Sequence, residues 1–532
     1  MKRAVTFLIL INTVCYSLAC QTAPLTVAER SGFTSTSNYN DVITFISQLK
    51  KMSKNVRTES IATSTEGYDV PLLVIGNPLP RSSEEMKNDN RIVVYVQANI
   101  HAGEVEGKEA SLMFARDLLT GKYPEILKNV VLLICPNFNP DGNEKISPAN
   151  RPYQNGPVNG VGLRHNGLWL DLNRDGIKAE SPEVRGVISN VFNKWDPAVF
   201  MDCHTTNGSY HVEPVTFTWM VNPNGDNSLI HYMRDKMAPA ISSALLKKYG
   251  VENCFYGEFN DMTRPEEGWY YEACDPRYMT NYYGLRNRLA VLNENYVYAD
   301  YESRVKGCYY LIRSIVEYAA SHREEIKKML AETDALTVKR GLSPAPEKVT
   351  IKTYEAETFT DENGRTRLRK SDRQKTVTVP YYIDYYPAKS VRFPYAYIIT
   401  VNDLAVINLM MTHGIKAERL LVPQRLAVER FELSELKPSV RLNQGHYINS
   451  VKGKFISDTL EFAANTLIIR TAQPLANLAA YLLEPQSTDG LLAWNFLDRY
   501  LVPQWGIGYS PCPVYRVVEK QDIITKSAED RR

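Results

Sequence analysis

The sequence predicts an α/β fold, a mixed central β-sheet flanked by helices, followed by a mostly β C-terminal domain. Short apolar runs rich in β-branched residues alternate with helical periodicity as far as Leu330, a pattern typical of strands joined by helices. From about Pro344 the runs become β-branched and aromatic, with Asn, Gly and Pro turns between them. The chain of 532 residues also exceeds the size at which one core stops growing. We therefore expect two domains.

The N-terminus has the composition of a secretory signal. Lys2 and Arg3 precede the apolar run 4–14, and Ser17-Leu18-Ala19 leads into Cys20. The apolar run is too short to span a membrane, and the small residues after it suit a cleavage site. We predict a signal peptide at 1–20, with cleavage after Ala19 or lipidation of Cys20 as alternatives. The protein is then exported, to the periplasm or to a lipid anchor at the bacterial cell envelope.

Residues 21–38 are polar and rich in Thr, so we predict a tether there. A first domain follows at 39–338. In its early part we predict a helix wherever apolar residues repeat along one helical face, and a strand wherever β-branched residues cluster. The predicted elements are a helix at Asn40–Met52, a hairpin at Arg57–Ile75 around Glu66-Gly67, a strand at Val93–Val96, a helix at Glu106–Leu119 and a doubly buried strand at Val130–Cys135.

The segment Asn137–Gly176 contains few apolar runs and many Asn, Gly, Pro and Asp residues. Loops of this length inside a compact domain are usually functional. Regular structure returns at Ser181-Pro182-Glu183, where serine can cap a helix and proline suits its first turn. Later elements are predicted as strands at Ala198–Cys203 and Arg288–Leu292 and helices at Asp226–Lys247 and Val305–Leu330.

The second domain, predicted at 344–532, is β-rich. Its clearest strand signals are Val377–Tyr386, Tyr395–Val401 and Thr466–Arg470. A net charge of +2, without a basic run interleaved with aromatic residues, excludes a nucleic-acid partner. The scattered cysteines are not a disulfide framework, although Cys254 and Cys274 could form a close pair. The sole predicted membrane contact is a lipid on Cys20.

Polar residues capable of binding a metal follow three predicted strands. His101 and Glu104 come after the strand at Val93–Val96, His204 ends the strand at Ala198–Cys203, and Glu294 follows Arg288–Leu292. Taken alone, two residues such as His101 and Glu104 are more often ordinary loop residues that bind no metal. The combination carries more weight, because strand ends on one side of an open sheet line the same crevice. Two imidazoles and a carboxylate suit an open zinc site.

The ordered motifs resemble a known family, the zinc metallocarboxypeptidases related to pancreatic carboxypeptidase A. The resemblance covers residues 40–330, and residues 344–532 resemble the accessory β domain of exported bacterial members. The motifs that carry it are His101-Ala102-Gly103-Glu104, Asn139-Pro140-Asp141-Gly142, Asp171-Leu172-Asn173-Arg174, His204-Thr205-Thr206 and Glu294, with Leu482-Leu483-Glu484-Pro485 and Trp494-Asn495 in the accessory segment.

The resemblance implies one Zn²⁺ per chain, held by His101, Glu104 and His204. Zinc lowers the pKa of a bound water to about 7, and Glu294 is then the carboxylate that takes and returns the proton. Asn173 and Arg174 match the pair that grips the C-terminal carboxylate of the substrate. A guanidinium suits this role because it meets a carboxylate through two parallel hydrogen bonds.

Three assignments stay open in the sequence. Either Arg151 or Arg164 could polarise the scissile carbonyl and hold the oxyanion. Asp202 could orient an imidazole from behind, or be an ordinary strand-end carboxylate. The mobile tyrosine of the family falls where five tyrosines crowd together, and Tyr278 fits best. The five are Tyr270, Tyr271, Tyr278, Tyr282 and Tyr283.

The leading interpretation is an exported zinc carboxypeptidase whose substrates are peptide or protein C-termini. A zinc amidase, deacylase or cell-wall peptidase on the same scaffold is the first alternative, and loss of the role of Arg174 would favour it. An inactive surface lipoprotein that only binds is the second. The presence of His101, Glu104, His204 and Glu294 together argues against the second, because a binding module needs no such set.

Overall fold

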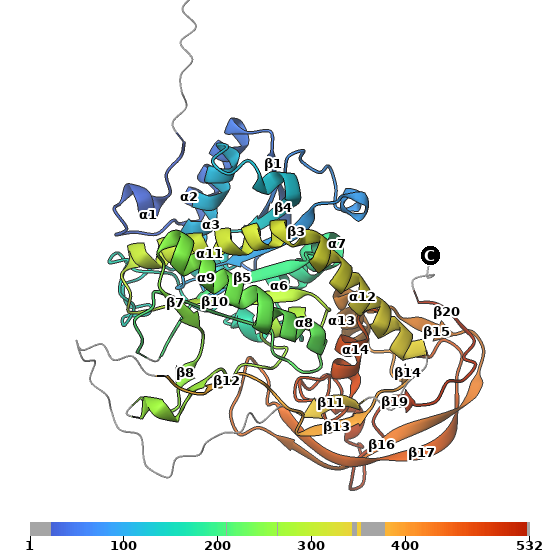
Figure 1. The fold of residues 1–532 in the computed structure, drawn as a ribbon. Helices are drawn as coiled ribbons and strands as arrows, with labels where there is room; N and C mark the ends of the chain where they lie inside the picture. Colours follow the sequence, from blue (N-terminus) through green and yellow to red (C-terminus); the bar gives the residue numbers. More distant parts are fainter. Residues whose placement is uncertain (1–22, 209, 263, 343–347, 353–377, 529–532) are drawn as a thin grey trace, which may run out of the picture.

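Two β-sheets of different kinds organise the chain (Figure 1). The computed structural model describes residues 23–208, 210–262, 264–342, 348–352 and 378–528. The predicted signal peptide at 1–20 and Cys20 lie outside these residues. Among the described helices, none combines the length and the apolar stretch that crossing a membrane requires.

The first sheet has eight strands in the order β1-β2-β4-β3-β5-β10-β6-β7. Its four central strands, β4, β3, β5 and β10, run parallel, while β1, β2 and β6 join antiparallel neighbours. This confirms the predicted mixed sheet. The strands are β1 (Val56–Thr63), β2 (Asp69–Ile75), β3 (Ile92–Ala98), β4 (Val130–Cys135), β5 (Val199–Thr205), β6 (Val215–Trp219), β7 (Asn253–Phe255) and β10 (Leu289–Asn295).

Helices cover both faces of this sheet. Alternate residues of β5 point to opposite faces, and each contacts the elements that cover its own face. Phe200 packs its ring against Phe192 and Tyr283 on one face. Cys203 points to the other face, where Gly107 of α3 approaches so closely that an added Cβ would lie 2.4 Å from the Cys203 Cβ. Only glycine allows this contact between α3 and the sheet. His204 and Asp202 share the parity of Phe200, and so lie on its face.

The helices and short helical turns of this part are α1 (Val27–Arg30), α2 (Tyr39–Met52), η1 (Glu84–Asn88), α3 (Glu106–Leu119), α4 (Ile126–Asn129), α5 (Pro140–Asn143), η2 (Leu172–Arg174), α6 (Pro182–Val187), η3 (Ile188–Phe192), α7 (Asn193–Trp195), α8 (Asn227–Tyr232), η4 (Met233–Met237), α9 (Ala238–Tyr249), η5 (Pro265–Glu267), α10 (Met279–Gly284), α11 (Tyr301–Ser321) and α12 (Arg323–Leu342). The segment predicted as one helix at Val305–Leu330 is divided, because His322 leaves helical geometry with φ −111° and ψ 17°.

The described part of the predicted tether, residues 23–38, packs against α3. Thr36 Oγ1 donates a hydrogen bond of 2.9 Å to Glu109, and the Ser37 amide donates one of 2.7 Å to the same carboxylate. Arg116 of α3 pairs with Glu29 of α1 at 2.7 Å. These contacts satisfy buried polar groups of the helix.

The second sheet has seven strands, all antiparallel, in the order β17-β16-β19-β14-β18-β15-β20. Its strands are β14 (Ala396–Ile399), β15 (Glu418–Leu420), β16 (Gln424–Pro438), β17 (Asn449–Phe462), β18 (Leu467–Arg470), β19 (Val514–Val517) and β20 (Thr525–Ser527), with helices α13 (Leu404–His413), α14 (Ala476–Leu483) and α15 (Asp498–Leu501) beside it. Short strands complete the chain: β8 (Glu258–Phe259), β9 (Trp269–Tyr270), β11 (Lys348–Lys352), β12 (Tyr381–Tyr382) and β13 (Lys389–Arg392).

Helix α12 joins the two sheets into one packed body. Gly341, near its end, has no room for a side chain, since a Cβ would lie 2.3 Å from the backbone of Thr471. His413 of α13 is fully buried; its Nε2 donates a hydrogen bond to the Ile177 carbonyl, and its Nδ1 accepts one from the Tyr282 hydroxyl. Burial lowers the pKa of His413 to about 3, so its ring is neutral. The two parts therefore share one continuous apolar core.

Candidate active site

His101, Glu104 and His204 meet at the C-terminal ends of the adjacent parallel strands β3 and β5. The two Nδ1 atoms lie 3.2 Å apart, and each lies 3.0 Å from the same oxygen of Glu104, Oε2. All three side chains are buried. Two of the ligands thus come from the turn after β3 and one from β5, as the spacing of the motifs predicts.

A carboxylate faces the other nitrogen of each imidazole. Asp171 Oδ1 lies 2.9 Å from His101 Nε2, and Asp202 Oδ2 lies 3.0 Å from His204 Nε2. A carboxylate beside Nε2 favours the tautomer with its proton on that nitrogen, which leaves the Nδ1 lone pair for a metal at the shared point. The arrangement supports the orienting role considered for Asp202 and adds Asp171, whose role was not predicted.

Both oxygens of Glu104 are engaged. Oε2 accepts a hydrogen bond of 3.1 Å from the Thr205 amide, and Oε1 lies 2.8 Å from Arg151 Nη1 and 3.3 Å from Arg164 Nη1. Burial acts to raise the pKa of Glu104, but the charges of His101 and Arg151 hold it well below its usual range. The carboxylate is therefore ionised, as a metal ligand must be.

The donor set fits zinc. Two neutral imidazole nitrogens and one carboxylate oxygen match the ligands of catalytic zinc sites, which keep a fourth position open. Tetrahedral zinc places its ligand atoms about 3.3–3.8 Å apart, close to the 3.0–3.2 Å between these atoms. His101, Glu104 and His204 would hold the ion, with Asp171 and Asp202 fixing the two rings.

Glu294 stands on β10, directly beside His204 in the sheet register. Burial raises the pKa of Glu294 to about 8, with His204 opposing this effect and Glu104 adding to it. A divalent cation at the neighbouring ligand set would lower that pKa, because it stabilises the carboxylate form. The residue is thus poised to exchange a proton near neutral pH.

A cavity of about 580 Å³ joins these groups. His101, Glu104 and Glu294 line it, together with Arg164, Asn173, Arg174 and Tyr278. The structure therefore brings all the predicted site residues together. Seven line the cavity, while His204 and Arg151 contact Glu104 without lining it. Residues that line the cavity without having been predicted include Thr205, Asn207, Tyr256, Glu258, Glu272, Thr280 and Leu292.

The two candidate arginines occupy different places. The Arg151 side chain is only 8% exposed; besides Glu104 it donates to the carbonyls of Thr205 and Thr206. The Arg164 side chain is 28% exposed, lines the cavity and pairs with Asp171 at 2.9 Å. Arg164 is therefore the arginine placed to meet a ligand in the cavity, whereas Arg151 is placed to fix Glu104.

Asn173, Arg174 and Tyr278 form one wall. The guanidinium of Arg174 lies over the Tyr278 ring at 4.4 Å, a cation–π contact. Asn173 Oδ1 accepts a hydrogen bond of 2.9 Å from the Met279 amide, which ties the loop of Asp171 to α10. Tyr270 and Tyr271 also line the cavity, but Tyr282 and Tyr283 are buried beneath it.

The motif Asn139-Pro140-Asp141-Gly142 holds backbone segments that lead into the site. Asn139 donates hydrogen bonds to the carbonyls of Ile100 and Arg164, at 3.4 and 3.2 Å, and its Oδ1 accepts the Gly142 amide. A Cβ on Gly142 would lie 2.4 Å from the Leu163 carbonyl. The motif thus fixes the backbone on both sides of the ligand turn and of Arg164.

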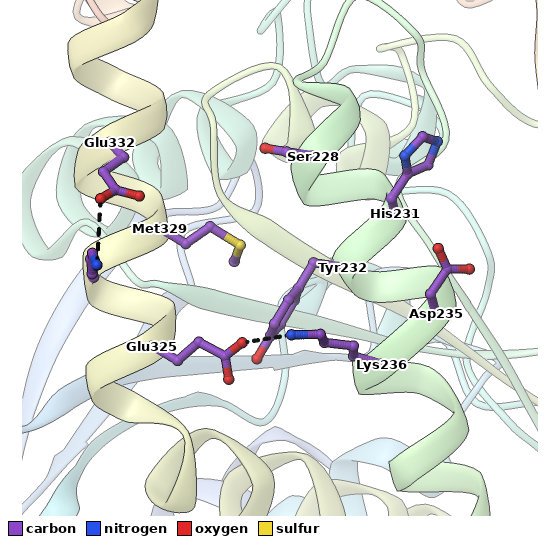
Figure 2. Close-up of a pocket in the computed structure, with 9 residues that line it drawn as sticks. Ser228, His231, Tyr232, Asp235, Lys236, Glu325, Met329 and Glu332 are labelled. Atoms are coloured by element: carbon purple, nitrogen blue, oxygen red, sulfur yellow. Dashed lines mark hydrogen bonds and ion pairs between the residues drawn. The ribbon is translucent and has the colours of Figure 1, made fainter.

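A second hollow, of about 460 Å³, lies between α12 and the α8–η4 segment (Figure 2). Lys236 and Glu325 pair across it at 3.0 Å, and Lys328 and Glu332 pair along α12 at 3.9 Å. These ion pairs are largely exposed, and such pairs contribute little. None of the predicted site residues lies there.

The six cysteines in the described part of the chain are all free, so Cys254 and Cys274 form no disulfide. Cys254 instead lies beside His211 and Glu213.

Comparisons with known proteins agree with this geometry. Residues 42–211 match the family model "Zinc carboxypeptidase". Carboxypeptidase 2 of Trichophyton equinum is 20% identical over 468 residues, covering 82% of this chain and 79% of that protein. Carboxypeptidase 2 of Trichophyton rubrum is 20% identical over 476 residues, covering 82% and 80%. A metallo-carboxypeptidase from Burkholderia cenocepacia aligns with a TM-score of 0.40 at 18% identity, covering 54% of this chain and 70% of that one.

The family match contains His101, Glu104, Arg174 and His204, so it covers the ligand set that the structure assembles. Residues 42–211 therefore match the zinc carboxypeptidase family model over the segment that holds the ligand set, and the enzyme is a metallocarboxypeptidase.

Proposed function

We propose that this enzyme is exported and removes residues from the C-termini of peptides, with one zinc ion held by His101, Glu104 and His204. One observation carries the proposal. A single cavity is lined by the ligands His101 and Glu104, the carboxylate of Glu294 and the guanidinium of Arg174. A peptide that places its terminal carboxylate on Arg174 can therefore present its last peptide bond to Glu294.

Zinc at this site supplies an activated water and polarises the scissile carbonyl. Glu294 accepts the proton from the attacking water and passes it to the nitrogen of the leaving amino acid. Partial burial raises the pKa of this carboxylate to about 8, which suits proton transfer near neutral pH. Arg164 donates hydrogen bonds to the oxygen that gains negative charge in the transition state.

Substrate is oriented at the opposite wall. Arg174 and the Asn173 amide group receive the terminal carboxylate, and the Tyr278 ring holds the Arg174 guanidinium in place through their 4.4 Å contact. Fixing the carboxylate fixes the distance of the scissile bond from Glu294, which lowers the entropic cost of reaction. Arg151 takes no part in substrate binding and holds Glu104 instead.

The test compares paired substrates on the variant Arg174→Ala. Without this cation, kcat/KM for free-acid peptides should fall by about 10²-fold or more, whereas C-terminally amidated versions of the same peptides should change little. The variant Arg185→Ala, on α6, is the matched control. Equal losses on both substrate series would contradict the exopeptidase proposal and favour an amidase, deacylase or endopeptidase.

Export is tested on the mature chain. Mass analysis of its N-terminus should find residues 1–19 removed, with or without a lipid on Cys20. An intact Met1 in protein from the native cell would contradict export.

A further inference from the structure

We propose that His211, Glu213 and Cys254 form a second metal site, which takes one zinc ion or a similar divalent cation and clamps the rim of the cleft. One ligand atom from each residue lies within 4.8 Å of the other two. In the described part of the chain, this cluster and the set of His101, Glu104 and His204 are the two groups of three potential ligands that lie so close.

The His211 ring points to this site and lacks a hydrogen bond there. Its Nδ1 is buried, has no hydrogen-bond partner, and lies 3.6 Å from Glu213 Oε2. The side chain of His211 is only 9% exposed, and its ring packs against Tyr296 at a tilt of 35°, with 3.8 Å between the ring centroids. A buried ring nitrogen without a partner costs free energy unless something else fills its lone pair. A cation would do so.

The spacing and chemistry of the three groups suit zinc. Tetrahedral zinc bound by nitrogen, oxygen and sulfur separates its ligand atoms by about 3.3–3.8 Å, and the 3.6 Å between His211 and Glu213 already lies in that range. His211 offers a ring nitrogen, Glu213 a carboxylate oxygen and Cys254 a sulfur. A cation bound beside Cys254 would deprotonate its thiol and yield a thiolate ligand.

The sheet places this site in one row with the first. Cys254 pairs with Thr216, Thr216 with Glu294, and Glu294 with His204. Cys254 therefore stands two strands away from Glu294, about 10 Å at the usual strand spacing. Metals that act together in one reaction lie about 3.5–4 Å apart. The second ion is thus separate from the reacting atoms.

The position of the second site suggests that a bound cation links two segments that line the cavity. His211 and Glu213 belong to the segment that leaves β5 just after His204, and Asn207 of that segment lines the cavity. Cys254 belongs to β7, which leads directly to Tyr256 and Glu258 on the same cavity. One cation bound by all three residues would tie these two cavity-lining segments together, and so fix the shape of the rim that substrates meet.

Cobalt substitution distinguishes the two sites. The first set has two imidazoles and a carboxylate, whereas the second includes a thiolate, so a thiolate-to-cobalt absorption band in the near ultraviolet reports the second site alone. The full-length protein should bind about two Co²⁺ per chain and show this band. Cys254→Ser should abolish the band and leave about one ion, while Cys274→Ser, which changes a buried cysteine outside the cluster, should change neither.

Further variants make the result decisive. His101→Gln should lose one ion and keep the band. If Cys254→Ser fails to fold by circular dichroism, His211→Gln replaces it and should lower cobalt stoichiometry from about two to one. The proposal is overturned if the wild-type protein binds one Co²⁺ without the band, or if the band persists in Cys254→Ser. Because the band does not depend on turnover, it stays informative even where the proposed peptidase activity fails.

Discussion

Arg151 and Arg164 reach the same carboxylate oxygen of Glu104 from different surroundings. Arg151 is enclosed by backbone carbonyls, whereas Arg164 is open to the cavity. A residue that holds a metal ligand acts on metal affinity, and a residue that meets the developing oxyanion acts on the rate. Sequence spacing did not distinguish the two arginines. Substituting Arg151 should change metal affinity, whereas substituting Arg164 should change the rate.

We expect Arg151→Met to weaken zinc binding by about 10–100-fold, with kcat largely restored by added zinc. Arg164→Met should keep its zinc affinity and lose about 10²–10³-fold in kcat. Zinc titration with a competing chelator and steady-state kinetics measure the two effects. Each variant is the control for the other. If Arg151→Met lost kcat and Arg164→Met lost zinc affinity, the two roles would be assigned the wrong way round.

Glu294→Gln should retain zinc and lose about 10²–10⁴-fold in kcat, because the amide cannot accept the proton of the attacking water. Metal analysis and single-turnover kinetics check this. The working form of Glu294 is the carboxylate, so kcat/KM of the wild type should fall as pH falls through its pKa. Residual activity of the variant should lack that acid limb, and unchanged turnover would mean that another group is the base.

The ligands and Glu294 could be predicted because each lies at the end of a sequence segment predicted as a strand. His101, Glu104, His204 and Glu294 follow short apolar runs, and the strand ends of a parallel sheet converge. Asp171 could not be assigned in the same way. It lies in the long loop Asn137–Gly176, whose path is set by hydrogen bonds to distant residues, and no periodicity in the sequence encodes that path. The choice between Arg151 and Arg164 stayed open for the same reason.

At the scale of elements, α6 carries an unusual buried acid. Glu183 is fully buried in the first turn of this helix, and Asn166 donates a hydrogen bond of 3.2 Å to its Oε2 while Oε1 has no partner. Burial raises the pKa of Glu183 from 4.5 to about 7. The folded state therefore binds a proton more tightly than the unfolded chain does between these two pH values.

The sign of this linkage gives a testable pH dependence. Stability from the protonated Glu183 is present below pH 4.5 and is lost as pH rises to about 7, in total about 3 kcal/mol. Glu183→Gln keeps an acceptor for Asn166 without the charge. It should match the wild type near pH 4 and exceed it above pH 7 by up to about 3 kcal/mol in urea unfolding. The exposed Glu324→Gln is the control, and a variant less stable at pH 8 would contradict the assignment.

Several elements escaped prediction because their burial removes the periodic signal. All eight residues of α14 are buried, so no polar face marks a helix there. Strands β6 and β7 are short, and they join the sheet beyond β10 through partners far along the chain. By contrast, the alternation of strands and amphipathic helices from β3 to α11 made the mixed sheet predictable.

At the scale of the whole molecule, the C-terminal part reaches the active-site loop. Gln444 Oε1 accepts a hydrogen bond of 2.7 Å from the Asp171 amide, and His446 Nε2 lies 2.8 Å from Glu180. Arg277, next to Tyr278, pairs with the buried Asp489 at 2.6 Å. The accessory sheet thus holds the loop that carries Asp171, Asn173 and Arg174.

Gln444→Ala should therefore weaken catalysis from outside the peptidase domain. Loss of one such hydrogen bond costs about 1 kcal/mol, so we expect kcat/KM to fall about 3–10-fold. Kinetics with one free-acid peptide measure it. Val440→Ala, whose parent residue in the same connection is 93% exposed, is the control. Equal kcat/KM in Gln444→Ala and the wild type would show that the sheet only stabilises the fold.

The hydrogen bond between Gln444 and Asp171 spans 273 positions of the sequence. A growing chain folds from its N-terminus, and the ribosome adds only about 5–20 residues per second. The residues that surround His101 and His204 are thus made many seconds before the residue that completes their loop. The loop that carries Asp171, Asn173 and Arg174 therefore gains this contact only after most of the chain has been made.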